Sequence, residues 1–335
     1  MSVPAEHAGV WTGEEVVILA DRGEAAAWSP AHQRWRELPP VPLSPRHGTQ
    51  MAWAGGRVVV FGGWSTGGPE PPLRDGAAYD PASDSWTPIE EPPALGEWTP
   101  AVVAAGDTVV VWAGSRPGDA YETGAWRVGG SAYDLAAQSW RPLPPAPVTR
   151  VHTAASVAAD GGVYVWGEHF PEGGIAPYAL SYDLRRDVWR RLADPPLDVP
   201  SEAAAVWTGD QLMLWGVPLS GRGGDEDTTV SGAAYDAASD RWTVLPRVPG
   251  LEEGGASLYG FASAWTGRSM IVHGGYPQSI SLAYTPAQHG WRQLPAGGGT
   301  RVNAVAAWTG QELLLWGGYT AAVPTVDLRA WRFGP

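Results

Sequence analysis

The residues best suited to chemistry in this chain are histidines and acids that stand beside short apolar segments. Five of the seven histidines lie in such positions, and an imidazole can gain or lose a proton near neutral pH. Glutamate and tyrosine side chains at comparable positions could share in proton transfer. The candidates for acid–base catalysis are His47, His152, Glu97, Glu202 and Tyr259, with His47 and His152 as the preferred pair.

A second group of residues is suited to binding. Arginine offers a two-pronged donor to a carboxylate, and tryptophan and tyrosine offer flat apolar surfaces. His273 belongs here because the related segments carry Phe or Trp at its position. The candidate ligand-binding residues are Arg46, Arg150, Arg301, Asn303, His273, Trp64, Trp98, Tyr276 and Tyr319. They suggest a small-molecule or glycan ligand that carries negative charge.

The spacing of the histidines gives little support to a metal site. The chain has no cysteine, which excludes disulfides, thiolate metal sites and cysteine nucleophiles. No two histidines have HxH or HxxxH spacing, so a Cu, Fe or Zn ion would need imidazoles from separate segments. Candidate ligands for such a site are His7, His47, His152 and His273. We expect no cofactor.

The elements that would position these residues follow from a sevenfold repeat. Six copies of a short polar turn end in Trp, about 50 residues apart, and a degraded seventh copy stands at 326–333. The six final tryptophans are Trp35, Trp86, Trp140, Trp189, Trp242 and Trp291. A repeat of this length is typical of architectures in which each unit buries its apolar face against its neighbours.

A second motif precedes each of these turns. It consists of an apolar run, a tight turn with glycine and a second apolar run, as in 205–217 (AVWTGDQLMLWGV) and 306–318 (AAWTGQELLLWGG). This pattern predicts two antiparallel strands, and the nearly continuous second run predicts a strand buried on both faces. A third strand that leads into the polar turn and a fourth that begins at the Trp would complete a four-stranded blade.

The chain resembles the kelch-repeat β-propellers over essentially its whole length. The matching residues are the glycines after the second strand, the Tyr–Asp pairs and the Trp six residues beyond each Asp, as in Gly62-Gly63, Tyr79-Asp80 and Trp86. The resemblance implies an all-β fold with kelch-like four-stranded blades in a single domain, 1–335. Seven strand pairs indicate seven blades, with six as the alternative. The expected blades span roughly 1–41, 42–93, 94–146, 147–196, 197–248, 249–297 and 298–335.

Composition narrows the classes of partner. The net charge of −13 disfavours nucleic acid, whose binding depends on neutralising phosphates with Lys and Arg. No apolar run reaches the length of about 18 residues that a membrane span needs, and residues 1–20 lack the pattern of a signal peptide. We therefore expect a cytoplasmic protein if Met1 is the native start, with a secreted domain that has lost its signal peptide as the alternative. The oligomeric state stays open.

Propeller topology would gather the candidate residues at one end of the ring. The segments before each innermost strand and after each second strand share a face and carry all the length variation, for example 64–75 and 218–231. We expect a ligand-binding pocket on this loop-rich face, at the mouth of the central channel. The alternative is an isomerase, lyase or cyclase that uses His, Glu and Arg in that pocket. A metal-dependent enzyme and a protein-interaction scaffold rank below these two.

Overall fold

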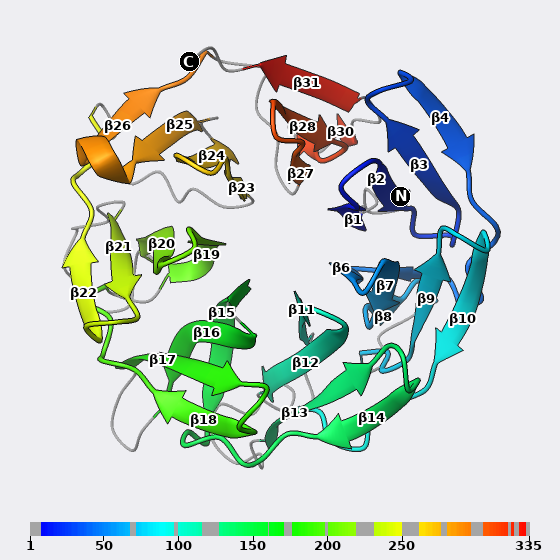
Figure 1. Cartoon of the computed structure of the whole chain (residues 1–335), viewed down its shortest axis with the longest axis horizontal. Helices are drawn as coiled ribbons and strands as arrows, with labels where there is room; N and C mark the ends of the chain where they lie inside the picture. The colour runs from blue at the N-terminus through cyan, green and yellow to red at the C-terminus, as the bar shows by residue number, and fades with distance from the viewer. Residues whose placement is uncertain are drawn as a thin grey trace.

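Small antiparallel sheets follow one another around a ring in the computed structural model (Figure 1). The structure describes residues 8–67, 72–96, 100–115, 127–159, 161–170, 176–197, 200–218, 231–249, 261–275, 280–295, 304–320, 323–324 and 328–332. The innermost strands of the first and last sheets, β1 (Ala8–Trp11) and β27 (Val305–Trp308), contact each other, so the ring is closed.

Six sheets have four strands each, ordered from the centre of the ring outward. The first three consist of β1, β2 (Val16–Leu19), β3 (Ala25–Ser29) and β4 (Arg34–Glu37); β6 (Gln50–Ala54), β7 (Arg57–Phe61), β9 (Gly76–Asp80) and β10 (Ser85–Ile89); and β11 (Ala101–Ala105), β12 (Thr108–Ser115), β13 (Arg127–Asp134) and β14 (Ser139–Pro142). The next three consist of β15 (Val151–Ala159), β16 (Gly162–His169), β17 (Ala176–Asp183) and β18 (Val188–Arg191); β19 (Pro200–Trp207), β20 (Gln211–Pro218), β21 (Ser231–Asp236) and β22 (Arg241–Val244); and β23 (Phe261–Trp265), β24 (Met270–Gly274), β25 (Ile280–Thr285) and β26 (Gly290–Gln293).

The seventh sheet has three described strands, β27, β28 (Glu312–Trp316) and β31 (Leu328–Arg332). Two short ribbons accompany the blades: β5 (Arg46–His47) pairs with β8 (Trp64–Ser65), and β29 (Tyr319–Thr320) pairs with β30 (Val323–Pro324). A 3-10 turn, Pro286–Gln288, connects β25 to β26. No helix in the described part of the chain is long and apolar enough to cross a membrane.

The predicted all-β propeller with kelch-like four-stranded blades is confirmed. Six blades are complete, and the three-stranded seventh sheet lies between the sixth and the first. The cores lie between blades rather than within them, as expected of units too small to bury their own apolar face. Val17 and Tyr79 share a cluster between the first two blades, and Val16 and Leu314 share one between the seventh sheet and the first blade.

The Trp of the fourth strand joins each blade to the one before it. In five blades its indole Nε1 donates a hydrogen bond of 2.7–3.0 Å to a backbone carbonyl just beyond the fourth strand of the preceding blade. The pairs are Trp86–Pro39, Trp140–Glu90, Trp189–Pro144, Trp242–Ala193 and Trp291–Pro246. The rings also pack on second-strand aromatics of the preceding blade, with the centroids of Trp189 and Trp112 4.6 Å apart.

In four blades, a large aromatic residue near the end of the second strand lies opposite a small residue on the third strand. The register pairs are Phe61–Gly76, Trp112–Gly130, Trp166–Ala179 and Trp215–Gly232. A Cβ atom at Gly130 would lie 2.4 Å from the Val111 carbonyl oxygen, so a larger residue does not fit there without a shift of the backbone. The sixth blade departs from this rule, because its corresponding pair is His273–Ser281.

Candidate functional site

The loop-rich face is defined by strand direction. Each innermost strand begins on this face and each second strand ends on it, because the two strands are antiparallel. His47 and Arg150 precede innermost strands, and Glu168, His169 and His273 stand at the ends of second strands. The described part of the predicted site is therefore a set of polar side chains at one level of the ring.

Arg46 is fully engaged by its own chain. Its side chain is 3% exposed, and its guanidinium donates to both carboxylate oxygens of Asp75 at 2.7 and 3.1 Å. Further hydrogen bonds reach the Ser44 carbonyl at 2.9 Å and the Gly62 carbonyl at 3.2 Å. The bidentate contact that we expected Arg46 to make with a ligand carboxylate is thus made with Asp75. This contact fixes the loop between β8 and β9 against the start of the blade.

His47 and Trp64 lie next to each other on the two-stranded ribbon of β5 and β8, beside the second blade. The register of β5 and β8 places them directly opposite each other, and both side chains are partly buried. Opposite residues in an antiparallel pair present their side chains on the same face of the ribbon. An imidazole and an indole therefore form one small surface, with a polar edge and a flat apolar part.

Glu168 is a polar residue that sequence reasoning overlooked. It occupies the second position of the glycine pair in its repeat, where Gly63 stands in the second blade, and it is 7% exposed. The strand register sets the His152 backbone opposite that of Glu168. The replacement of a repeat glycine by an acid was the available signal, because glycine at this position has no side chain to contribute.

His169 and His273 differ from the histidines at the strand starts. Burial lowers the pKa of His169, and the positive charge of Arg191 on the outermost strand lowers it further. His273 is 4% exposed, and its Nδ1 shares a 2.7 Å hydrogen bond with the Ser281 hydroxyl. The structure therefore encloses His273 inside the sixth blade, where the expected aromatic would pack, and its role in ligand binding stays a prediction.

Several predicted site residues lie outside the described residues. They are His7, Glu97, Trp98, Tyr259, Tyr276, Arg301 and Asn303. His152, Glu202 and Tyr319 are placed by their backbone alone, in β15, β19 and β29. Among the residues that the structure describes, no group of three or more His, Asp or Glu side chains could hold a metal ion. The acid–base pair of His47 and His152 stays a prediction.

A network of arginines that the sequence analysis did not single out links neighbouring blades. Arg36 follows Trp35 on the first blade and donates to the Tyr79 hydroxyl of the second blade at 3.0 Å, while Tyr79 donates to Asp84 at 2.6 Å. Arg141 with Tyr182 and Asp187, and Arg190 with Tyr235 and Asp240, repeat the arrangement. The signal in the sequence is an Arg directly after the repeat Trp.

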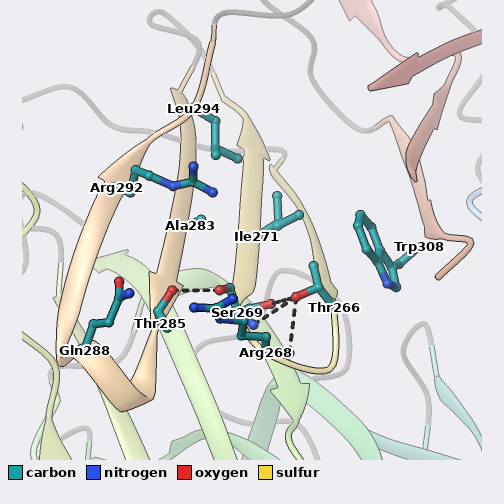
Figure 2. A pocket seen from close by; sticks show the side chains of 10 residues that line it. All are labelled: Thr266, Arg268, Ser269, Ile271, Ala283, Thr285, Gln288, Arg292, Leu294 and Trp308. Atoms are coloured by element: carbon teal, nitrogen blue, oxygen red, sulfur yellow. Dashed lines mark hydrogen bonds between the residues drawn. The ribbon is translucent and has the colours of Figure 1, made fainter. Parts of the chain in front are cut away.

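A pocket of about 410 Å³ opens between the sixth blade and the seventh sheet, on the face opposite the loops. Figure 2 shows Arg292, Ala283 and Ile271 on the strands of the sixth blade and Leu294 directly after β26, with Trp308 on the opposite side of the pocket. The described residues that line it are Thr266, Arg268, Ser269, Ile271, Ala283, Thr285, Gln288, Arg292, Leu294 and Trp308, and we call it the Arg292 pocket.

Comparison with known proteins agrees with the blade architecture. The sequence model of the Kelch motif matches residues 45–93, which include all four strands of the second blade. A curated relative, the Kelch-like protein terF of Aspergillus terreus, is 26% identical over 186 residues, which is 49% of this chain and 39% of the relative. The match therefore covers well under half of the relative's length. The chain is thus a β-propeller whose second blade matches the Kelch motif, and its other Trp-linked blades have the same strand arrangement.

Proposed function

We propose that this propeller binds a small anionic molecule or glycan on its loop-rich face, at the mouth of the central channel. The observation that carries the proposal is the His47–Trp64 pair on the β5–β8 ribbon. An aromatic platform beside a hydrogen-bonding group suits the apolar face and the hydroxyl edge of a sugar ring. Arg150, directly before β15 on the same face, is the described arginine that supports recognition of a carboxylate.

Arg46 is left out of the proposed ligand set. Its guanidinium is buried and bound to Asp75, so releasing it would leave an unpaired carboxylate and an unpaired buried cation. Arg301 remains in the set on sequence grounds, because it precedes the innermost strand of the seventh sheet as Arg150 precedes β15.

A matched pair of sugars tests this proposal. Glucuronate and glucose differ in a carboxylate, so titration calorimetry should detect glucuronate and show much weaker binding of glucose. Trp64→Ala should weaken binding of glucuronate, and Arg150→Gln should weaken it by about tenfold, the effect of losing one charge-assisted contact. Arg241→Gln, at an exposed strand position on the outer rim, is the control. Equal affinities for the wild type and for both Arg150→Gln and Arg301→Ala would refute the placement.

A second candidate function is acid–base catalysis on a sugar acid at the same place. It is favoured by Glu168, a buried carboxyl group whose strand position lies opposite His152. A histidine and a glutamate at adjacent positions could exchange a proton with a substrate in an isomerisation or elimination. Polarimetry of freshly dissolved glucuronate would follow anomer exchange. Unchanged rates in a His47→Ala, His152→Ala double variant would dispose of this function and leave the binding proposal standing.

A further inference from the structure

The use of arginine at the blade interfaces follows a rule. In the first five blades, the residue after the repeat Trp is arginine where the turn of the following blade carries an aspartate, and threonine where it does not. Arg36, Arg141 and Arg190 face Asp84, Asp187 and Asp240, whereas Thr87 and Thr243 precede blades with Gln138 and His289 at that turn position. The arginine therefore accompanies a carboxylate.

Each of the three arginines also lies near an aromatic ring. Arg36 and Arg141 place their guanidinium carbons 6.0 and 5.9 Å from the ring centroids of Tyr79 and Tyr182. Arg190 donates to the Tyr235 hydroxyl at 2.6 Å. Three filled interfaces thus show the same arginine position holding a phenol and a carboxylate together.

Arg292 occupies this position on the sixth blade, and its interface differs. It follows Trp291 and pairs in register with Ala283, as Arg36 pairs with Ala27. On the seventh sheet, the register gives Trp331 the strand position that Tyr79 has in the second blade. No carboxylate of the described residues pairs with Arg292, which lines the Arg292 pocket instead.

The lining of the pocket has the properties of a site for an aromatic acid. Arg268 and Arg292 supply two positive charges, and none of the described lining residues is acidic, although the chain as a whole carries a net charge of −13. Ile271, Leu294 and Trp308 supply apolar surface. The volume of about 410 Å³ falls within the range of small-molecule sites.

Hydroxyl groups line the turn side of the pocket. The hydroxyls of Ser269 and Thr285 share a 2.7 Å hydrogen bond, and only one of the two hydrogens is used in it. The Thr266 hydroxyl is taken up by its own turn, where it donates to the Ser269 carbonyl at 3.0 Å. The Ser269–Thr285 pair can therefore donate one further hydrogen bond to a phenol or carboxylate oxygen.

We propose that the Arg292 pocket binds an aromatic carboxylate, with the carboxylate on Arg292 and the ring between Ile271 and Trp308. The same chemistry could come from a free aromatic acid or from a peptide segment with a tyrosine and an aspartate five residues later, the spacing of Tyr235 and Asp240. This site lies on the face opposite the loop-rich face, so it is independent of the function proposed above.

Two probes distinguish the sources. The first is 3-(4-hydroxyphenyl)propionate, with 4-ethylphenol and propionate as controls that carry the ring or the carboxylate alone. The second is a synthetic peptide of residues 235–242, YDAASDRW, which contains the tyrosine, the aspartate and the Trp of a complete turn. Titration calorimetry should show binding of at least one probe and weaker binding of both controls. Binding of neither probe overturns the proposal.

Three variants test whether the probe binds in the Arg292 pocket. Arg292→Gln should lower the affinity for the probe at least tenfold, because a charge-assisted contact is lost. Arg292→Lys should retain part of the affinity. Arg241→Gln removes an exposed arginine from the fourth strand of another blade and should leave affinity unchanged. The thermal unfolding midpoint of each variant should match that of the wild type, because Arg292 is exposed. Equal affinity of Arg292→Gln and wild type would place the probe elsewhere and overturn the proposal.

Discussion

The indole of Trp35 lies edge-on against the indole of Trp316, with ring centroids 4.7 Å apart and an angle of 63° between the ring planes. Trp35 belongs to the fourth strand of the first blade and Trp316 to the second strand of the seventh sheet. The pair thus repeats, across the two ends of the chain, the contact that Trp189 makes with Trp112 between consecutive blades. Ring closure uses the same side-chain contact as the rest of the propeller.

Removal of the Trp35 ring should weaken the closed ring. Trp35 is 37% exposed, so Trp35→Ala should cost less than a fully buried Trp, about 2 kcal/mol of the free energy of unfolding. Urea unfolding followed by circular dichroism measures the change. Trp35→Phe keeps a ring and should lose only part of that stability. A Trp35→Ala curve that overlays the wild type would show that the contact with Trp316 adds nothing to closure.

Two adjacent glycines in β13 should respond differently to the same change. A Cβ at Gly130 would meet the Val111 carbonyl oxygen at 2.4 Å, whereas a Cβ at Gly129 meets nothing within 4 Å. We expect Gly130→Ala to destabilise the protein by about 2 kcal/mol through overpacking. Gly129→Ala should stay within about 0.5 kcal/mol of the wild type. Similar unfolding midpoints for the two variants would contradict the steric account of the aromatic–glycine pairs.

Substitutions at His273 and Ser281 should have non-additive effects on the free energy of unfolding. His273→Phe restores the aromatic residue of the other blades but removes the partner of the Ser281 hydroxyl, and we expect it to cost about 1–3 kcal/mol. Adding Ser281→Gly recreates the Phe61–Gly76 combination and should recover part of the loss. Chemical denaturation of the wild type, both single variants and the double variant gives the coupling between the two positions. Strictly additive effects would show that His273 and Ser281 act separately.

Ionisation of the Tyr182 hydroxyl should make the stability of the fold depend on pH in the alkaline range. Burial, together with the hydrogen bond to Asp187, raises the pKa of Tyr182 to about 12. The unfolded chain releases this proton near pH 10 while the folded chain keeps it, so stability should fall as the pH rises from 10 towards 12. The stability difference between the wild type and Tyr182→Phe should therefore shrink over this range. A constant difference from pH 8 to 11 would refute this assignment.

Sequence reasoning succeeded where the repeat constrains every copy. The Trp spacing and the paired apolar runs predicted the blades because each unit must bury the same faces, and the strand registers agree across copies. It did not foresee the contact between Arg46 and Asp75, because Asp75 lies in a connecting segment whose length and sequence vary from blade to blade. Glu168 was missed although its replacement of a repeat glycine could be seen in the sequence. The Arg292 pocket was missed because it arises where the interface pattern of the other blades is interrupted.

The five indole hydrogen bonds all run in the same direction along the chain, from a later blade to the exit of the one before it. During synthesis, a folded blade is therefore held by this indole hydrogen bond only when the following blade has left the ribosome. The first blade waits longest for its second neighbour, because Trp316 lies in the seventh sheet, far along the chain from Trp35. We expect nascent chains halted after residue 191, when the third blade is outside the ribosome, to resist protease up to β10 and to be cleaved readily between β11 and β14. Pulse proteolysis of ribosome-bound chains would show this pattern. Uniform cleavage along such chains would show that no blade is secured before release.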